Sequence, residues 1–341
     1  MIKAGFFASL RTGKDSRRLL YAFTSLAVIA IVIAALLLIL HLREEADKRV
    51  ASSTANLVRS LDQTIEGLLV RADLALQVST DEISHQLLTG TRDPASITRF
   101  LTKQQERVPE LDLLRATNAA GEVVYGAGVI PEERASLAQR DYFKQLKENP
   151  DLGMVIAEPL LGKISKKWIW LMARRIPAPD GGFAGLVYGS IFTDDIAAMF
   201  EHIDMPNGSV ISLRDHHLRI VARNKGYAAP VPLGEIVHSP EFEVAYQLNQ
   251  REGTYDAGAS TADGISRKYS YLSNQKYGFV IHVGVPLSEV REQTKRQERL
   301  IFGFLGVFTL FALVFVRLLG KAWLRREKDI EELTRSQQAL V

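Results

Sequence analysis

The first half of the chain contains 24 consecutive positions, Leu19 to Leu42, without Asp, Glu, Lys or Arg. An α-helix rises about 1.5 Å per residue, so this stretch covers the roughly 30 Å hydrocarbon core of a bilayer. A second apolar stretch, Leu300 to Val316, is 17 residues long. Arg317 can direct its guanidinium to the lipid headgroups, which extends that span to residue 319. The sequence therefore predicts transmembrane helices over 19–42 and 300–319.

A cleaved signal peptide is the alternative for the first stretch. The apolar region of a signal peptide has about 7–15 residues and ends at a small-residue cleavage site. Here the stretch is longer and is followed by His41-Leu42-Arg43-Glu44-Glu45 without such a site. We therefore expect a membrane helix that is retained.

Basic residues beside the two spans predict the orientation. Residues 1–18 and 317–328 each contain five Lys or Arg against one acid, whereas the flank after residue 42 is mixed. By the positive-inside rule both ends are expected in the cytoplasm. Residues 43–299 are then periplasmic in a multi-pass protein of the bacterial inner membrane, with the lipid bilayer as a partner. The net charge of +3 largely reflects these basic flanks, so it does not indicate nucleic-acid binding.

The motif content argues against catalysis. The chain has no cysteine, which excludes disulfides and thiol nucleophiles. It contains no phosphate-binding loop, no His-Glu-x-x-His and no nucleophile elbow. We expect no cofactor, no metal and no catalytic site in this chain. An output domain would be missing from it or supplied by a partner, since the sequence ends at Val341 within a predicted helix.

A long helix is predicted directly after the first span. Apolar residues recur with a period of 3.6 between Arg43 and Leu88, and Gly90 and Asp93-Pro94 end the pattern. The expected buried face consists of Leu57, Leu61, Ile65, Leu68, Leu69, Ala72, Ala75, Leu76 and Ser79. Such a helix suits a stalk that packs against the domain above it.

Strand and turn patterns beyond the stalk repeat once. Hairpins are predicted to start near residues 111 and 168, and again near 209 and 267. Both pairs are about 98 residues apart, which indicates a structural repeat. The fold class is therefore α+β: two tandem PAS-like modules on a long N-terminal helix, flanked by two transmembrane helices.

The predicted domain boundaries follow from these patterns. They are 1–18 for a cytoplasmic N-terminus, 43–94 for the stalk, 95–203 for a membrane-distal module, 204–288 for a membrane-proximal module, 289–299 for a helix into the membrane, and 320–341 for a cytoplasmic coiled-coil helix. The coiled coil rests on a/d spacing. Its positions are Trp323, Ile330, Leu333, Gln337 and Leu340.

Several short pieces occur in an order that resembles a known family. They are Ala138 to Phe143, Glu158-Pro159 followed by Trp168, Arg174 to Gly185, Gly189 to Ile191, Arg267 to Tyr271, and Val283 to Pro286. This ordered set resembles the double Cache (tandem PAS-like, or PDC) sensor domains of bacterial diguanylate cyclases and histidine kinases. The resemblance covers about residues 43–299. It implies a small ligand held against the sheet of the membrane-distal module, and a homodimer paired through stalks and spans.

The resemblance makes Arg140 and Tyr142 ligand-binding candidates, because in relatives the loop that contains this motif closes the pocket. A guanidinium suits a ligand carboxylate, since it makes two parallel charged hydrogen bonds. The alternative is an arginine that holds the loop through backbone carbonyls. Phe143 is expected in the core.

Large side chains alternate along the strand that begins near Lys167, so they share one face of the sheet. They are Trp168, Trp170, Met172 and Arg174. Aromatic rings next to a cation suit a small anionic or amphipathic ligand, which makes both tryptophans and Arg174 candidates. The alternative is a packed face with an arginine that reaches solvent.

Tyr188 and Ser190 complete the candidate set. Relatives that bind amino acids carry an Asp at about the position of Ser190, which receives the ammonium group. An uncharged residue there favours a carboxylate or another metabolite over an amino acid. Asp194 and Asp195 are expected to cap the following helix, and the adjacent His216 and His217 are expected in a solvated turn.

The leading interpretation is a sensor that binds a small molecule outside the membrane and regulates a cytoplasmic enzyme. A diguanylate cyclase is the first expectation for that enzyme and a histidine kinase the second. A chemotaxis-type receptor is an alternative within signalling, although Pro286 is the last proline and such receptors carry one soon after the second span. A membrane-anchored scaffold that binds protein is the alternative from another class, and it predicts no enclosed pocket.

Overall fold

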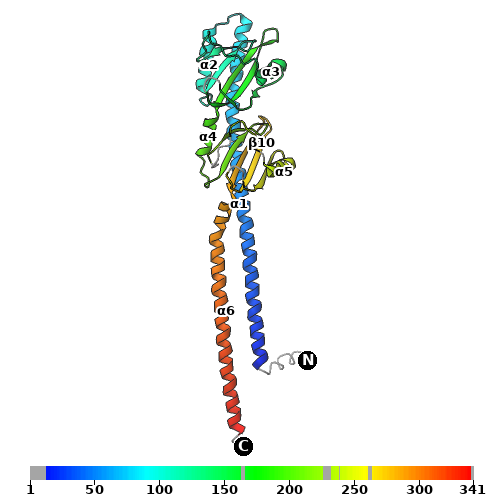
Figure 1. Ribbon diagram of the computed structural model, residues 1–341, viewed down its shortest axis with the longest axis vertical. Helices are drawn as coiled ribbons and strands as arrows, with labels where there is room; N and C mark the ends of the chain where they lie inside the picture. The colour runs from blue at the N-terminus through cyan, green and yellow to red at the C-terminus, as the bar shows by residue number, and fades with distance from the viewer. Residues whose placement is uncertain (1–12, 163–165, 226–231, 238, 260–262, 339–341) are drawn as a thin grey trace. The chain divides into compact units, whose positions relative to one another are not determined.

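The computed structural model describes residues 13–162, 166–225, 232–237, 239–259 and 263–338 (Figure 1). The chain divides into two compact units. One, the helical unit, consists of Met1–Arg49 and Val290–Val341; the other, the outer unit, is Val50–Glu289.

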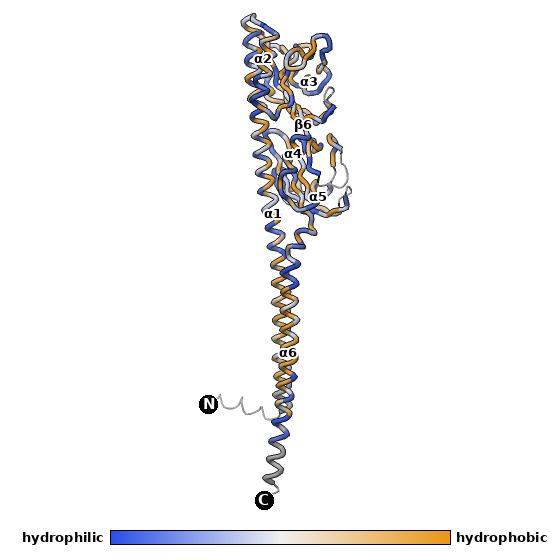
Figure 2. The backbone as a smooth tube through the Cα atoms, turned by 90° about the vertical axis from the view of Figure 1, so that its left-hand side faces the viewer, coloured by the Kyte–Doolittle hydropathy of each residue, from blue (hydrophilic) through white to orange (hydrophobic). Residues whose placement is uncertain are grey.

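Two helices form the described part of the helical unit. They are α1 (Gly13–Thr89), whose C-terminal half belongs to the outer unit, and α6 (Leu287–Gln338). Among the described residues, both are long and apolar enough to cross a membrane, and Figure 2 shows their apolar stretches in orange. Arg43 on α1 donates to both carboxylate oxygens of Glu298 on α6, at 2.7 and 3.1 Å. This ion pair lies just beyond both predicted spans.

The predicted coiled-coil positions cannot be compared with the structure. The backbone of α6 is helical to Gln338, but the side chains of Trp323, Ile330, Leu333 and Gln337, and all of Leu340, lie outside the described residues. Pairing at these positions stays a prediction.

In the outer unit, α1 supports two sheets along its length (Figures 1 and 2). The predicted apolar face of the stalk is confirmed: Leu61 to Ser79 in that set are buried, and Leu57 is partly buried. Burial of each Leu or Ile contributes roughly 1.5–3 kcal/mol. The helix ends at Thr89, and Gly90 adopts a positive φ of 68°, as the predicted stop requires.

The first sheet is antiparallel with strand order β2-β1-β6-β5-β3, and β4 also pairs with β5. Its strands are β1 (Leu113–Thr117), β2 (Val123–Gly126), β3 (Val155–Ile156), β4 (Leu160–Leu161), β5 (Trp168–Pro177) and β6 (Phe183–Phe192). The helices around it are α2 (Pro94–Arg107), α3 (Asp141–Glu148) and α4 (Thr193–Glu201). We call residues 94–201 the first module.

The second sheet has the order β8-β7-β11-β10-β9. Its strands are β7 (Val210–Arg214), β8 (Ile220–Arg223), β9 (Glu252–Ala257), β10 (Arg267–Asn274) and β11 (Phe279–Pro286), with helix α5 (Pro240–Leu248) between β8 and β9. We call residues 210–286 the second module. The two sheets share one strand order, and β1 and β7 start 97 residues apart, as β5 and β10 start 99 apart. The predicted repeat and fold class are confirmed.

Each sheet has one face on α1 and one face away from it. In β5, Trp170 and Met172 belong to the large core that α1 shares with both sheets, whereas Leu171 and Ala173 belong to a separate cluster with Tyr142 and Tyr188. This alternation follows from the two-residue period of a strand. The two faces of the first sheet therefore pack into two separate clusters, one of which contains α1.

One capping prediction needs correction. The N-cap of α4 is Phe192, which makes no side-chain capping bond, and Asp194 and Asp195 lie inside the first turn. Their negative charges there interact favourably with the positive end of the helix dipole. His216 and His217 lie in an exposed turn, as predicted.

Candidate functional site

A pocket of about 220 Å³ lies on the face of the first sheet that points away from α1. Strands β1, β5 and β6 supply its floor, and the segment before α3 supplies one side. Its lining includes Asp112, Leu113, Arg115, Leu137, Arg140, Tyr142, Ile169, Leu171 and Tyr188. The volume suits a metabolite of a few heavy atoms.

Arg140 and Asp112 bring opposite charges to this pocket. Arg140 is the N-cap residue of α3, with an extended backbone that places its side chain at the helix entrance. Neither its guanidinium nor the Asp112 carboxylate makes a hydrogen bond or ion pair within the described residues. Burial raises the pKa of Asp112, while Arg115 and Lys167 act against that rise. Both groups are thus available to a ligand.

Two tyrosines form the aromatic part of the lining. Tyr142 and Tyr188 are 5% and 6% exposed, so nearly all of each ring is shielded from water. Burial raises the pKa of Tyr188 to about 12, partly offset by the charge of Arg115 and by a hydrogen bond with its side chain. Burial also raises the pKa of Tyr142. Both phenols are therefore protonated donors at neutral pH.

Ser190 lies in the floor of the same face. It is paired in register with Leu113 on β1 and Leu171 on β5, and both of those residues line the pocket. Its side chain is fully buried, and its Oγ has no hydrogen-bond partner within the described residues. An unsatisfied buried hydroxyl costs roughly 1–3 kcal/mol, so a ligand that reached it would recover this free energy.

Trp170 and Arg174 lie on the opposite face, so the predicted ligand role does not fit this pocket. Trp170 is 1% exposed and packs edge to face on Phe279 of the second module, with centroids 6.3 Å apart. Arg174 donates to both carboxylate oxygens of Asp73 on α1, at 2.5 and 2.9 Å. The shared face was predicted correctly, but it is the face that α1 covers.

Trp168 also lies outside the pocket. A Cβ at Gly234 would lie 3.0 Å from its ring, so the indole packs on the segment that follows β8 in the second module. Gly234 has φ 81°, and the close approach leaves no room for a larger residue there. Of the seven candidates, the structure gathers Arg140, Tyr142, Tyr188 and Ser190; their ligand roles stay predictions.

Comparisons with known proteins concern the fold. No protein-family model matches the chain, and no curated protein matches it. Solved structures do. The extracellular domain assigned to histidine kinase rpHK1S-Z16 is 22% identical with a TM-score of 0.61, over 71% of this chain and 97% of that one.

Two similar structures are ligand complexes. The ligand-binding domain of Campylobacter jejuni chemoreceptor Tlp3, solved with L-valine, is 13% identical with a TM-score of 0.52, over 73% of this chain and 97% of that one. The ligand-binding domain of Mlp24, solved with asparagine, is 16% identical with a TM-score of 0.54, over 73% and 97%. Each likeness covers nearly three quarters of this chain and almost the whole of the solved domain.

The outer unit has the double Cache fold. These neighbours are sensor domains rather than catalytic ones, so the fold gives no reason to expect a catalytic site. The pocket that Arg140 and Tyr188 line lies in the first of the two modules of this fold.

Two charged residues that line the pocket were not predicted from the sequence. Asp112 precedes β1, and Arg115 lies within it, donating its Nε to the Ala127 carbonyl at 3.0 Å. Strand alternation places Arg115 on the same face as Leu113, so its position could have been predicted once that face was known. Asp112 belongs to no pattern and only the folded loop brings it to the pocket.

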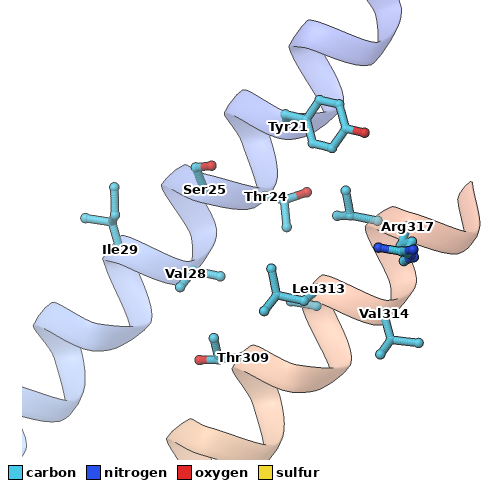
Figure 3. Close-up of a pocket in the computed structure, with 11 residues that line it drawn as sticks. Tyr21, Thr24, Ser25, Val28, Ile29, Thr309, Leu313, Val314 and Arg317 are labelled. Carbon is cyan, nitrogen blue, oxygen red and sulfur yellow. The ribbon is translucent and has the colours of Figure 1, made fainter. Parts of the chain in front are cut away.

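A larger groove, of about 690 Å³, lies between α1 and α6 in the helical unit (Figure 3). Figure 3 shows that its side chains come from both helices, including Tyr21, Thr24, Thr309 and Arg317. The two threonine hydroxyls already donate to carbonyls of their own helices, at 2.8 Å each. The rest of the lining is mostly apolar. This groove therefore offers fewer charged and hydrogen-bonding side chains to a soluble ligand than the smaller pocket does.

Proposed function

We propose that the chain is a transmembrane signal-sensing module that binds a small ligand in the pocket of its first module and regulates a cytoplasmic output domain. One observation carries this proposal. The fold brings an unpaired guanidinium, an unpaired carboxylate and two buried phenols to one 220 Å³ pocket, and the buried Ser190 hydroxyl lies on the same face of the sheet, between two residues that line it. A face that served only for packing would have these groups paired or replaced by apolar side chains.

The ligand class proposed here is a zwitterion of amino-acid size. Arg140 suits a ligand carboxylate, and Asp112 suits an ammonium group. The uncharged Ser190 on β6 predicts a carboxylate ligand rather than an amino acid. However, the Asp112 carboxylate, which precedes β1, supplies a negative charge to the pocket that could bind an ammonium group. Sensor domains of the same fold have been solved with L-valine and with asparagine, which supports this class.

Signal transfer would pass through the sheet. Leu171 faces the pocket, while its neighbours Trp170 and Met172 face α1. Arg174, two residues after Met172 on the same strand, forms an ion pair with Asp73 of α1. A ligand that binds more tightly to one arrangement of the sheet on α1 shifts the equilibrium by its difference in affinity, and a 100-fold difference is worth about 2.7 kcal/mol.

Titration calorimetry on the full chain in lipid nanodiscs tests the proposal. The probes are the 20 standard amino acids, matched carboxylates without the amine, and matched amines without the carboxylate. We expect saturable binding of at least one zwitterion. Arg140→Ala should weaken carboxylate-bearing probes about tenfold or more, and Asp112→Asn should do the same for amine-bearing probes.

Arg134→Ala is the matched control, because Arg134 is exposed and does not line the pocket. Binding should be unchanged in that variant. If no probe binds a folded chain, the small-molecule proposal fails. If only carboxylates bind and Asp112→Asn has no effect, the ligand is an anion and the zwitterion class is excluded.

The proposal extends to the orientation of the chain in the membrane and to the type of cytoplasmic domain that it regulates. We propose an inner-membrane protein with residues 43–299 periplasmic, the domain boundaries predicted from sequence, and a homodimer. The basic flanks of the two apolar helices support this orientation. The similar structures come from a histidine kinase and chemoreceptors, which favours those outputs; nothing in the comparisons supports a diguanylate cyclase.

The scaffold alternative is less well supported. It predicts no enclosed pocket, and the pocket of the first module is open to solvent on one side but lined by ionisable groups that suit a small ligand. The buried position of Trp170 fits both interpretations, so it does not decide between them.

A further inference from the structure

Two buried polar side chains in the second module have nitrogen atoms without partners within the described residues. His282 on β11 is 0% exposed, and neither of its ring nitrogens has a hydrogen-bond partner within the described residues. Arg214 on β7 is 4% exposed, and its Nε has no partner either. Such groups are rarely left unpaired, because each costs free energy comparable to a lost hydrogen bond.

These two side chains lie on the face of the second sheet that points away from α1. Their strand neighbours Leu213, Ile281 and Val283 belong to the core that α1 shares with both sheets, so the alternating residues Arg214 and His282 face outward. In the first sheet, the outward face is the one that carries the pocket.

The second module closes this face with aromatic rings. Phe242 of α5 lies over His282 with centroids 4.5 Å apart, and the Arg214 guanidinium lies 5.7 Å from the same ring. Tyr271 lies beside them, and its hydroxyl donates to backbone carbonyls at Ala245 and Asn249. Phe242 and Tyr271 therefore shield His282 and Arg214 on this face.

The charge of this enclosed set is positive. Arg214 is always protonated, and it makes no ion pair within the described residues; its Nη1 donates to the Val237 carbonyl at 3.3 Å. Burial and, to a smaller extent, the charge of Arg214 lower the pKa of His282 well below 6.5. A neutral imidazole still donates one N–H. A buried cation without a counter-charge is costly, and an anion would remove most of that cost.

We propose that the second module holds a small monoanion, of the size of formate, acetate or a halide, between the Nε–H of Arg214 and an N–H of His282. The anion accepts both hydrogen bonds and neutralises the guanidinium. It sits beneath Phe242 of α5, on the face of the second sheet that points away from α1. The site is separate from the pocket of Arg140 and does not depend on the function proposed for it.

The test uses the full chain in lipid nanodiscs. Sodium formate, acetate and bromide are titrated against sodium gluconate at constant ionic strength, and hydrogen exchange of α5 and β11 is followed with the thermal midpoint. We expect saturable protection of both segments by at least one small anion. Gluconate, which is too large for an enclosed site, should have no effect.

Variants separate this site from others. Arg214→Met should weaken the anion effect about tenfold or more, whereas Arg251→Met, at an exposed position, and Arg140→Ala, in the first module, should leave it unchanged. Persistence of the effect in Arg214→Met, or its loss in Arg140→Ala, would overturn the proposal.

A second measurement does not depend on a folded variant. Crystals of the full chain grown in bromide should show an anomalous peak between Arg214 and His282. Density for an ordered water alone, together with no anion dependence of hydrogen exchange, would show that water satisfies these groups and would refute the anion site.

Discussion

The two modules share one strand order, yet the faces that point away from α1 differ in kind. In the first module this face presents Leu171, Ala173 and Ser190 beneath an open pocket. On the corresponding face the second module carries Tyr269, Tyr271 and His282, with Phe242 of α5 over His282. Small side chains leave space above the first sheet, and aromatic side chains narrow it above the second.

This difference teaches that the backbone topology alone does not create a ligand site. Both sheets have an outward face on which a ligand could bind. The volume of the outward-facing side chains on the two central strands decides whether space for a ligand remains. The second module uses the same face for aromatic packing, in which Phe242 contacts Tyr246, Tyr255, Tyr271 and His282. We expect the second module to be the more rigid of the two, and the following predictions test that expectation.

The largest effect is expected at Arg267. This side chain is fully buried, donates to the Gly208 carbonyl at 2.8 Å and makes two hydrogen bonds with Asp263. Arg267→Met removes the buried cation that pairs with the Asp263 carboxylate, so the free energy of unfolding should fall by about 3–5 kcal/mol. Urea denaturation measures it. Lys268→Met, which removes an ion pair with the exposed Asp256, should cost less than about 1 kcal/mol.

A smaller effect is expected where the first module is clamped to α1. Asp73→Asn removes one charge from the pair with Arg174, whose side chains are 18% and 22% exposed. Stability should fall by about 1–3 kcal/mol. A double-mutant cycle with Arg174→Gln measures the coupling. A coupling energy near zero would mean that this pair does not connect the sheet to α1.

The next effect is a pH dependence in the second module. The folded pKa of His282 lies below 6.5, so the unfolded chain takes up a proton first as the pH falls. Stability from neutral His282 is complete above pH 6.5 and declines below it, by at most about 1.4 kcal/mol per pH unit, until the folded pKa is reached. Arg214, Tyr271 and Tyr246 are the ionisable groups around it.

Denaturation curves between pH 7 and 5, in a buffer without small anions, measure this slope. His282→Gln should flatten it, because the other histidines contribute equally to both proteins. An unchanged slope would mean that His282 is protonated in the folded state or accessible to water.

The smallest effect is expected at Ser190. Its Oγ has no partner within the described residues, so Ser190→Ala should raise the free energy of unfolding of the unliganded chain by about 1 kcal/mol, because it removes an unsatisfied buried hydroxyl. The same substitution should weaken ligand binding if the hydroxyl contacts the ligand. A clear loss of stability without ligand would instead reveal a bound water at this position, and would make the two modules more alike.

The fold was largely predictable, because it rests on periodic patterns. The apolar period of α1 and the repeated hairpins both indicated the elements that the structure contains. The site was less predictable. Alternation showed that Trp170 and Arg174 share a face, but a two-residue period does not tell which face α1 covers. Asp73, the partner of Arg174, lies 101 residues away in sequence, and no local pattern connects them.

Some pocket residues could be predicted from a local pattern in the sequence, and others could not. Arg140 and Tyr142 were predictable from a short motif that resembles a known family. Asp112 reaches the pocket only because its backbone N–H bonds to the carbonyl of Ser190, at 2.8 Å, at the end of β1. Such a position depends on tertiary pairing, which a single sequence does not reveal.

Gly284 on β11 has a consequence for how these modules can diverge. A Cβ built there would lie 2.4 Å from the ring of Tyr269, so any larger residue collides with that tyrosine. A lineage in which the second module gained an open face would have to replace Tyr269 with a smaller residue before it replaced Gly284. In the reverse order, the intermediate protein would carry a side chain at position 284 that collides with the Tyr269 ring. The two positions are therefore epistatic, and the order of substitutions in any relative with an open second module should show it.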